Sequence, residues 1–170
     1  MNKKSIISRV ALLALCGGAL LVAATGCMRS YRSAPTLEFE DIPYRSVAGK
    51  AWPQKSLVLH QVPATYKMKS EPRITYVELN PKGGQTIVFI HGLGSYLKFW
   101  RYQLDHFAKQ GYRVIALDLP GYGKSDKPAS FPYTMEAMAD VVRELLARLK
   151  IVKPVLIGHS MGGQTALSFA

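Results

Sequence analysis

Residues 158–163, which read Gly-His-Ser-Met-Gly-Gly, constrain the fold of this chain more than any other stretch. They follow the apolar residues 154–157 and lead into residues 164–170, a pattern that predicts a strand, a tight turn and a helix. In the Gly-x-Ser-x-Gly spacing, glycine two positions before and after the serine avoids a Cβ clash between strand and helix. The hydroxyl of Ser160 would then stand at the helix N-terminus, where the helix dipole favours a developing negative charge.

Two upstream stretches also pair a buried strand with a glycine-containing turn. Residues 85–90 predict a strand that ends in His-Gly-Leu-Gly at 91–94, and a strand predicted at 112–117 is followed by Asp-Leu-Pro-Gly-Tyr-Gly-Lys-Ser-Asp at 118–126. Together with the serine turn, these motifs resemble the α/β-hydrolase family in kind and in order. The resemblance covers roughly residues 57–170, which correspond to the first part of such a fold.

The strands alternate with helices along this region. Residues 74–79 are a good strand candidate, and residues 57–59 and 66–69 are weaker ones. Near-continuously apolar strands separated by helices predict an α/β fold, with a mostly parallel sheet covered by helices on both faces. In such a fold the site lies at the carboxyl ends of the strands.

The most regular helix is predicted after Thr134, which suits the N-cap position. Its apolar residues recur at helical spacing and form the buried side. Four charged residues are expected on the outer side: Asp140, Arg143, Glu144 and Arg148.

Residues 1–26 have the pattern of a secretory signal peptide. Three basic residues precede an apolar run at residues 10–24, and small residues follow it. The run is shorter than the about 20 residues that a membrane-spanning helix needs, and an internal Gly-Gly pair weakens it further. We therefore expect this segment to be removed from the mature protein.

Residues 24–27, Ala-Thr-Gly-Cys, are similar to the lipobox of bacterial lipoproteins, with alanine where leucine is usual. This resemblance implies a diacylated Cys27 at the mature N-terminus and anchorage in a lipid membrane. After removal of residues 1–26, Cys27 is the only cysteine, so no disulfide can form within the chain. We expect an envelope lipoprotein, in the outer membrane if the cell has one; the alternative is an ordinary secreted protein with a stray cysteine.

The mature chain divides into two parts. Residues 27–56 read as a tether and an irregular lead-in, whose apolar side chains, such as Tyr44 and Trp52, can still pack on the fold. Residues 57–170 read as the N-terminal part of an α/β-hydrolase domain.

The family resemblance implies roles for three residues. Ser160 is the expected nucleophile, and the backbone N–H groups of Leu93 and Met161 are the expected oxyanion hole. Serine at this position favours acyl substrates such as esters, because the dehalogenase and epoxide-hydrolase branches carry aspartate there.

A serine nucleophile needs a base, and none is evident in this chain. The family order is serine, acid, histidine, yet no histidine follows Ser160. His91 and His159 lie in the turn motifs and are expected to make local hydrogen bonds, and Asp118 is expected to brace the turn that follows it. We therefore expect a fragment that lacks the triad acid and histidine and has little activity.

Composition excludes several other functions. The formal net charge is +11, and +8 once the three basic residues of the signal peptide leave, but the remaining charge is dispersed. A nucleic-acid module would need a concentrated basic patch with stacking aromatic residues, and none is evident. The turn at 118–126 lacks the first glycine of a phosphate loop, and no metal-ligand spacing appears, so no cofactor or metal is expected.

Two functions follow from these patterns. The first is a membrane-anchored serine hydrolase of the α/β-hydrolase family, acting on a small acyl substrate. The alternative is a membrane-tethered, non-enzymatic binding protein derived from such a hydrolase, in which the absence of triad partners is genuine.

Overall fold

The computed structural model describes residues 42–170, so the predicted signal peptide and Cys27 lie outside the described residues. A five-stranded sheet forms its centre, in the order β1-β2-β4-β3-β5. The strands are β1 (Gln54–Val58), β2 (Arg73–Leu79), β3 (Thr86–Ile90), β4 (Arg113–Leu117) and β5 (Val155–Gly158). β3 pairs in parallel with β4 and β5, whereas β2 is antiparallel to both β1 and β4. The predicted α/β class is confirmed, with a sheet that is mixed because of β1 and β2.

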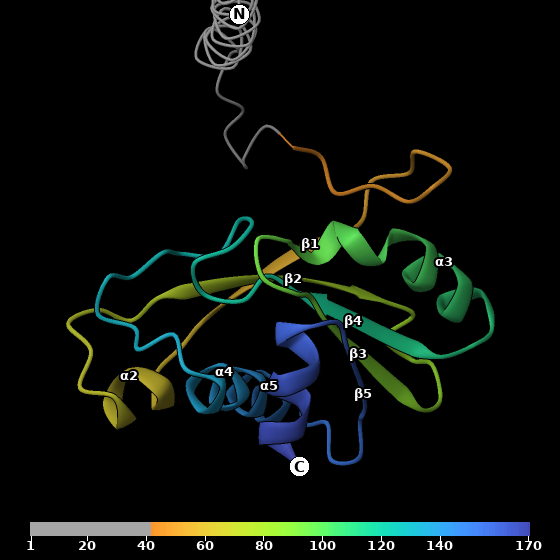
Figure 1. Cartoon of the computed structure of the whole chain (residues 1–170). Coiled ribbons are helices and arrows are strands. Elements are labelled where there is room, and N and C mark those ends of the chain that lie inside the picture. The colour runs from red at the N-terminus through yellow and green to blue at the C-terminus, as the bar shows by residue number, and fades with distance from the viewer. Residues whose placement is uncertain (1–41) are drawn as a thin grey trace, which may run out of the picture. The chain divides into compact units, whose positions relative to one another are not determined.

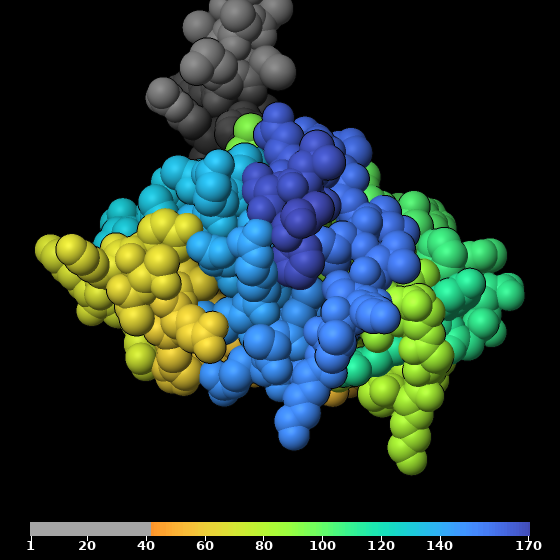
Figure 2. All heavy atoms as spheres, turned by 90° about the horizontal axis from the view of Figure 1, so that it is seen from below, coloured from red at the N-terminus to blue at the C-terminus, as the bar shows by residue number. Residues whose placement is uncertain are grey.

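Helices cover both faces of this sheet (Figure 1). On one face lie η2 (Leu97–Trp100) and α3 (Arg101–Lys109). On the other lie α2 (Gln61–Thr65), α4 (Met135–Arg148) and α5 (Met161–Phe169). Figure 2 shows the second face, where α4 and α5 lie side by side.

The central strand β3 shows how the two faces are built. Val88 and Ile90 pack with the side chains of α4, whereas Ile87 and Phe89 pack with η2 and α3. Successive side chains of a strand point to opposite faces, so a strand covered on both sides has no polar face. All five residues of β3 are accordingly buried.

The predicted start of α4 is confirmed. The hydroxyl oxygen of Thr134 accepts a hydrogen bond from the Ala137 N–H at 3.2 Å, which satisfies one of the free N–H groups of the first turn. The predicted apolar side of α4 is buried against the sheet, while Asp140 and Arg143 form an ion pair of 2.6 Å near the surface.

The prediction for Glu144 is wrong, because this side chain is buried. Its carboxylate accepts three hydrogen bonds from the N-terminus of α2, from the N–H groups of His60 (2.5 Å), Gln61 (3.1 Å) and Val62 (2.9 Å). A carboxylate at a helix N-terminus satisfies free donors and interacts favourably with the helix dipole. Glu144 therefore attaches α2 to α4.

The weak strand expected at residues 66–69 is also wrong. These residues follow α2 in a turn, in which the Tyr66 N–H donates to the Val62 carbonyl and the Met68 N–H donates to the Pro63 carbonyl. The weak candidate at 57–59 overlaps β1, which begins three residues earlier at Gln54.

The described part of the lead-in packs on the α3 face of the sheet. Tyr44 and Trp52 are buried there, as their apolar character allowed. Between them, residues 45 and 51 form an isolated antiparallel bridge. Within residues 42–170, no helix has the length and apolar character to cross a membrane.

Candidate active site

The strand, turn and helix predicted around Ser160 are present as β5, the serine turn at residues 158–163 and α5. Ser160 has φ 51° and ψ −118°, lies between the end of β5 and the start of α5, and is exposed. Positive φ is costly for a residue with a Cβ, so neighbouring hydrogen bonds must hold this conformation. The His159 N–H donates to the Ile90 carbonyl at 3.1 Å, and the Gly162 N–H donates to the His159 carbonyl at 2.8 Å.

Close packing explains two glycines of the turn. A Cβ at Gly158 would clash with the backbone of Gly162, and a Cβ at Gly162 would clash with the carbonyl of Ile90. Gly163 has no such restriction, because its nearest neighbour would be the Gly158 carbonyl oxygen at 3.6 Å. The prediction that glycine is needed two positions before and after the serine is confirmed.

The His-Gly-Leu-Gly turn lies directly against the serine turn. A Cβ at Gly92 would lie 2.9 Å from Nδ1 of His159 and 3.3 Å from Cβ of Ser160. The turn is closed by a hydrogen bond of 3.2 Å from the Ser95 N–H to the Gly92 carbonyl. Only glycine lets the two turns approach so closely.

Of the two residues expected to supply oxyanion amides, one follows Ser160 in the sequence and the other follows Gly92, which lies against Ser160. Met161 is the first residue of α5, where backbone N–H groups have no partner within the helix. Leu93 follows Gly92 and is 74% exposed. Their expected roles stay predictions.

His91 links the two upstream turns instead of standing free. Its Nε2 accepts a hydrogen bond from the Leu119 N–H at 3.1 Å, so Nδ1 carries the proton and donates to the Gly92 carbonyl at 2.8 Å. Burial lowers the pKa of His91, although the Gly92 carbonyl acts in the opposite direction. The predicted local hydrogen bonds of His91 are confirmed, and its ring is held neutral.

Asp118 braces the turn that follows β4, as predicted. Its carboxylate accepts hydrogen bonds from the Tyr44 hydroxyl (2.5 Å) and from the N–H groups of Leu97 (2.7 Å) and Lys124 (2.9 Å). Burial raises the pKa of Asp118, and these three donors partly oppose that effect. A Cβ at Gly123 would clash with the carboxylate, so the turn closes tightly around it.

The remaining histidines have other contacts. The His159 ring lies 5.0 Å from the ring of Phe99, while its backbone makes the hydrogen bonds of the serine turn. His60 lies 2.9 Å from the exposed carboxylate of Glu71, and His106 packs edge-on against Phe107.

Sequence reasoning missed two contacts around the site. Tyr122 donates a hydrogen bond of 3.7 Å to the sulfur of Met161 and so joins the turn after β4 to the start of α5. Tyr44 holds Asp118 from 74 residues away. No local pattern marks such pairs, although a tyrosine in a glycine-rich turn is a reasonable candidate for one. Within residues 42–170, no group of three or more His, Cys, Asp or Glu side chains is arranged to hold a metal ion.

A family model described as alpha/beta hydrolase fold matches residues 85–170, which contain all three turns. The chain belongs to the α/β hydrolase fold family.

Several known proteins are similar to this chain. It is 38% identical over 99 residues to epoxide hydrolase 3 of Xenopus tropicalis, which is 58% of this chain and 27% of that protein. A crystal structure of a probable hydrolytic enzyme from Pseudomonas aeruginosa PAO1 superimposes with a TM-score of 0.62 at 32% identity, covering 75% of this chain and 41% of that one. An esterase from Exiguobacterium antarcticum gives a TM-score of 0.55 at 35% identity, covering 60% and 37%. The chain spans between 22% and 38% of the length of the first curated relatives that it matches.

Proposed function

We propose that the protein is a serine hydrolase that acts on an ester or a related acyl substrate. The observation that carries the proposal is the strained conformation of Ser160 at the N-terminus of α5, with the Gly92 turn in contact with it. Strain of this kind is kept only where the surrounding structure maintains it, and it is typical of catalytic sites. Here the strained turn presents the exposed hydroxyl of Ser160 to a substrate.

Each group has a distinct task in this reaction. The Ser160 oxygen attacks the substrate carbonyl carbon while a base removes its proton, and the carbonyl oxygen becomes negatively charged. The N–H groups of Met161 and Leu93 donate hydrogen bonds to that oxygen. Collapse of the intermediate expels the alcohol, which takes up the proton, and water then releases the acyl group from Ser160.

An acyl substrate agrees better with the nucleophile than an epoxide does. The known proteins that resemble this chain include both an esterase and epoxide hydrolases. Serine at position 160 is the feature that favours the first class, because the family resemblance assigns aspartate to the second.

Little hydrolysis is expected from the 170-residue chain itself. Its four histidines have other contacts, and both nitrogens of His91 are occupied. Without a base, binding and the oxyanion hole leave a rate about 10³ to 10⁴ above that in water, which is far below that of a complete triad.

A fluorophosphonate probe tests the proposal, since it labels serines that a base activates. The samples are the 170-residue chain, its Ser160→Ala variant and the longest natural reading frame. Labelling of the longest form that is lost in Ser160→Ala supports the serine hydrolase. Strong Ser160-dependent labelling of the short chain would contradict the missing base. A folded longest form that stays unlabelled would favour the non-enzymatic binding protein.

We further propose export and lipidation at Cys27, with anchorage in the cell envelope. The support is the signal-peptide pattern and the single cysteine that remains in the mature chain. Mass spectrometry of the membrane fraction should find an acylated N-terminus at Cys27. A soluble product with another N-terminus, or an uncleaved signal segment, would overturn this proposal.

A further inference from the structure

A cavity of about 440 Å³ lies at the end of the sheet opposite to Ser160. Leu79 lines it and pairs with Val114 at the start of β4, whereas Ser160 follows the end of β5. β4 and β5 both run parallel to β3, so the start of β4 and the end of β5 lie at opposite ends of the strands. The cavity is therefore separate from the candidate active site.

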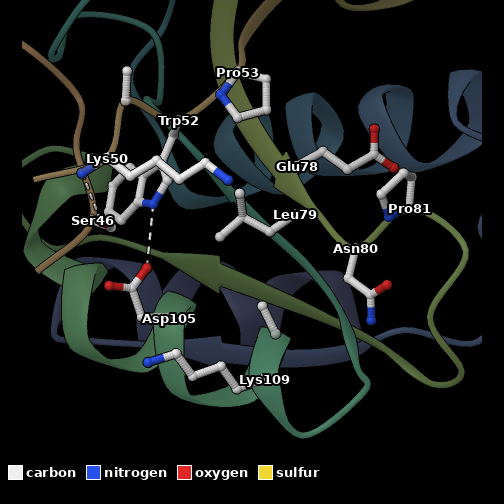
Figure 3. Close-up of a pocket in the computed structure, with 12 residues that line it drawn as sticks. Ser46, Lys50, Trp52, Pro53, Glu78, Leu79, Asn80, Pro81, Asp105 and Lys109 are labelled. Atoms are coloured by element: carbon white, nitrogen blue, oxygen red, sulfur yellow. Dashed lines mark hydrogen bonds between the residues drawn. The ribbon is translucent and has the colours of Figure 1, made fainter. Parts of the chain in front are cut away.

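Apolar groups form much of the cavity wall. The indole of Trp52 faces Leu79, with Pro53 near them, and Pro81 lies farther along the wall beside Glu78 and Asn80 (Figure 3). Ala108 is contributed by α3. A volume of this size is within the range of small-molecule sites, which combine apolar walls with a few polar groups. The walls suit the apolar body of a small molecule.

Asp105, on α3, fixes one wall. One oxygen of its carboxylate accepts a hydrogen bond from the Val47 N–H at 2.8 Å. The other accepts one from Trp52 Nε1 at 3.3 Å, which Figure 3 shows as a dashed line. These bonds hold the lead-in against α3. They also occupy both oxygens of Asp105, so this carboxylate is engaged with the protein.

Glu78, on β2, fixes the opposite wall. Its side chain is 4% exposed and lies between Lys55 at 2.5 Å and Arg113 at 2.6 Å. Two cations therefore more than balance the one buried carboxylate. Neither carboxylate of the cavity is left to attract a cation.

The two lysines of the cavity are different, because their side-chain amines have no ion pair or hydrogen bond among residues 42–170. Lys50 and Lys109 line the cavity from the lead-in and from α3, and both are exposed. Among the lining residues these two lysines balance Glu78 and Asp105, and the partners of Glu78, Lys55 and Arg113, add two positive charges behind the wall. The resulting positive potential favours an anionic ligand.

We propose that this cavity binds a small carboxylate with an apolar body. The ammonium groups of Lys50 and Lys109 receive the carboxylate at the mouth, and the body lies against Trp52 and Leu79. The walls are held in place by Asp105 and Glu78 before the ligand arrives, which lowers the entropic cost of binding. This site does not depend on the proposed hydrolase activity.

Calorimetric titration of the full-length protein tests the proposal with three probes. Octanoate carries both the charge and the apolar body, octanamide lacks the charge, and acetate lacks the body. We expect octanoate to bind about tenfold more tightly than octanamide, since two exposed charge pairs contribute about that factor. Octanoate should also bind more tightly than acetate, because acetate has no apolar body to bury. Equal binding of octanoate and octanamide would overturn the proposal, as would no binding of octanoate.

Variants locate the binding. Lys50→Gln/Lys109→Gln should remove the tenfold preference for octanoate over octanamide, whereas Lys67→Gln/Lys69→Gln, at exposed lysines outside the cavity, should keep it. Ala51→Phe fills the cavity from an exposed position and should abolish binding.

Ser160→Ala separates this site from the candidate active site and should bind octanoate as the wild type does. If Ala51→Phe fails to fold, the two lysine pairs decide the question. Binding that is unchanged in Lys50→Gln/Lys109→Gln would place octanoate elsewhere and overturn the proposal.

Discussion

Of two neighbouring glycines in the serine turn, Gly162 has no room for a Cβ and Gly163 does. A matched pair of alanine substitutions tests this difference. Gly162→Ala should lower the free energy of unfolding by about 1–3 kcal/mol, because its Cβ would press on the Ile90 carbonyl. Gly163→Ala should be neutral or stabilise by about 0.5–1 kcal/mol, because its Cβ meets no atom closer than 3.6 Å and alanine favours a helix. Urea unfolding of both variants, made in the longest natural reading frame, measures the difference. Equal destabilisation would mean that the packing of α5 on β3 is not the cause.

Glu78 gives a prediction about pH. Burial by itself would raise the pKa of Glu78, but the hydrogen bonds and charges of Lys55 and Arg113 outweigh it and hold the pKa below its usual 4.5. Glu78→Gln should therefore lower the free energy of unfolding at pH 7 by about 1.5–3 kcal/mol, the usual contribution of hydrogen bonds to charged groups.

The sign of the pH effect follows from the lowered pKa. Between the folded and the unfolded pKa, the unfolded chain binds more protons than the folded protein, so stability rises with increasing pH and falls as the pH is lowered through that range. The contribution of Glu78 is complete above pH 4.5 and is lost as the pH falls through its folded pKa. The difference between wild type and Glu78→Gln should shrink accordingly in unfolding experiments below pH 4.5.

Glu71→Gln, at an exposed ion pair, is the control and should cost less than about 1 kcal/mol at any pH. If the difference in unfolding free energy between wild type and Glu78→Gln stays constant with pH, the ion pairs of Glu78 are not its source.

At the scale of elements, α2 is too short to be stable alone and depends on Glu144. Glu144→Gln replaces an anion that accepts three N–H groups with a neutral amide, so we expect a loss of about 1–3 kcal/mol. Hydrogen exchange should show the loss of protection at the N–H groups of residues 60–62 in particular.

Glu136→Gln is the matched control for that experiment. Glu136 lies in the first turn of α4 and is exposed, so its substitution should cost at most about 1 kcal/mol through the helix dipole. Exchange at residues 60–62 should not change in this variant. If Glu144→Gln unfolds the whole protein without earlier exchange in α2, the carboxylate stabilises the core in general instead of this helix.

The elements that the sequence predicted well are those with a local signal. The strands at residues 74–79 and 85–90 are apolar and β-branched, and Thr134 precedes a regular helical pattern, so each could be located within a few residues. Residues 60–69 have no such signal. Their helix exists because a side chain from residue 144 binds its N-terminus, and propensity does not report that contact.

The same distinction applies to the candidate site. The turn around Ser160 and the brace formed by Asp118 could be predicted, since glycine spacing within a few residues determines both. The hydrogen bond from Tyr44 to Asp118 and the contact of Tyr122 with Met161 could not. Each joins segments that come together only when the sheet forms.

At the scale of the whole molecule, β5 lies at one edge of the sheet and α5 packs beside it. Val155 is 46% exposed on β5, and Leu167 is 79% exposed on α5. A strand edge that carries apolar residues offers unpaired N–H and carbonyl groups to another chain. Within residues 42–170, β5 and α5 therefore carry exposed apolar side chains at this edge of the sheet.

This edge predicts poor solution behaviour for residues 27–170 produced alone. We expect concentration-dependent association in sedimentation velocity experiments and no cooperative unfolding of a monomer. Val155→Lys should reduce the association, because a lysine on an edge strand disfavours pairing with another chain, and the position is exposed enough to accept the charge. Val47→Lys is the matched control: Val47 is 55% exposed but lies in the lead-in, away from β5, so it adds the same charge without blocking the edge. An equal decrease in association in both variants would show that net charge, not the edge of β5, governs the association. A monomeric wild-type segment that unfolds cooperatively would show that residues 27–170 need no further partner for this edge.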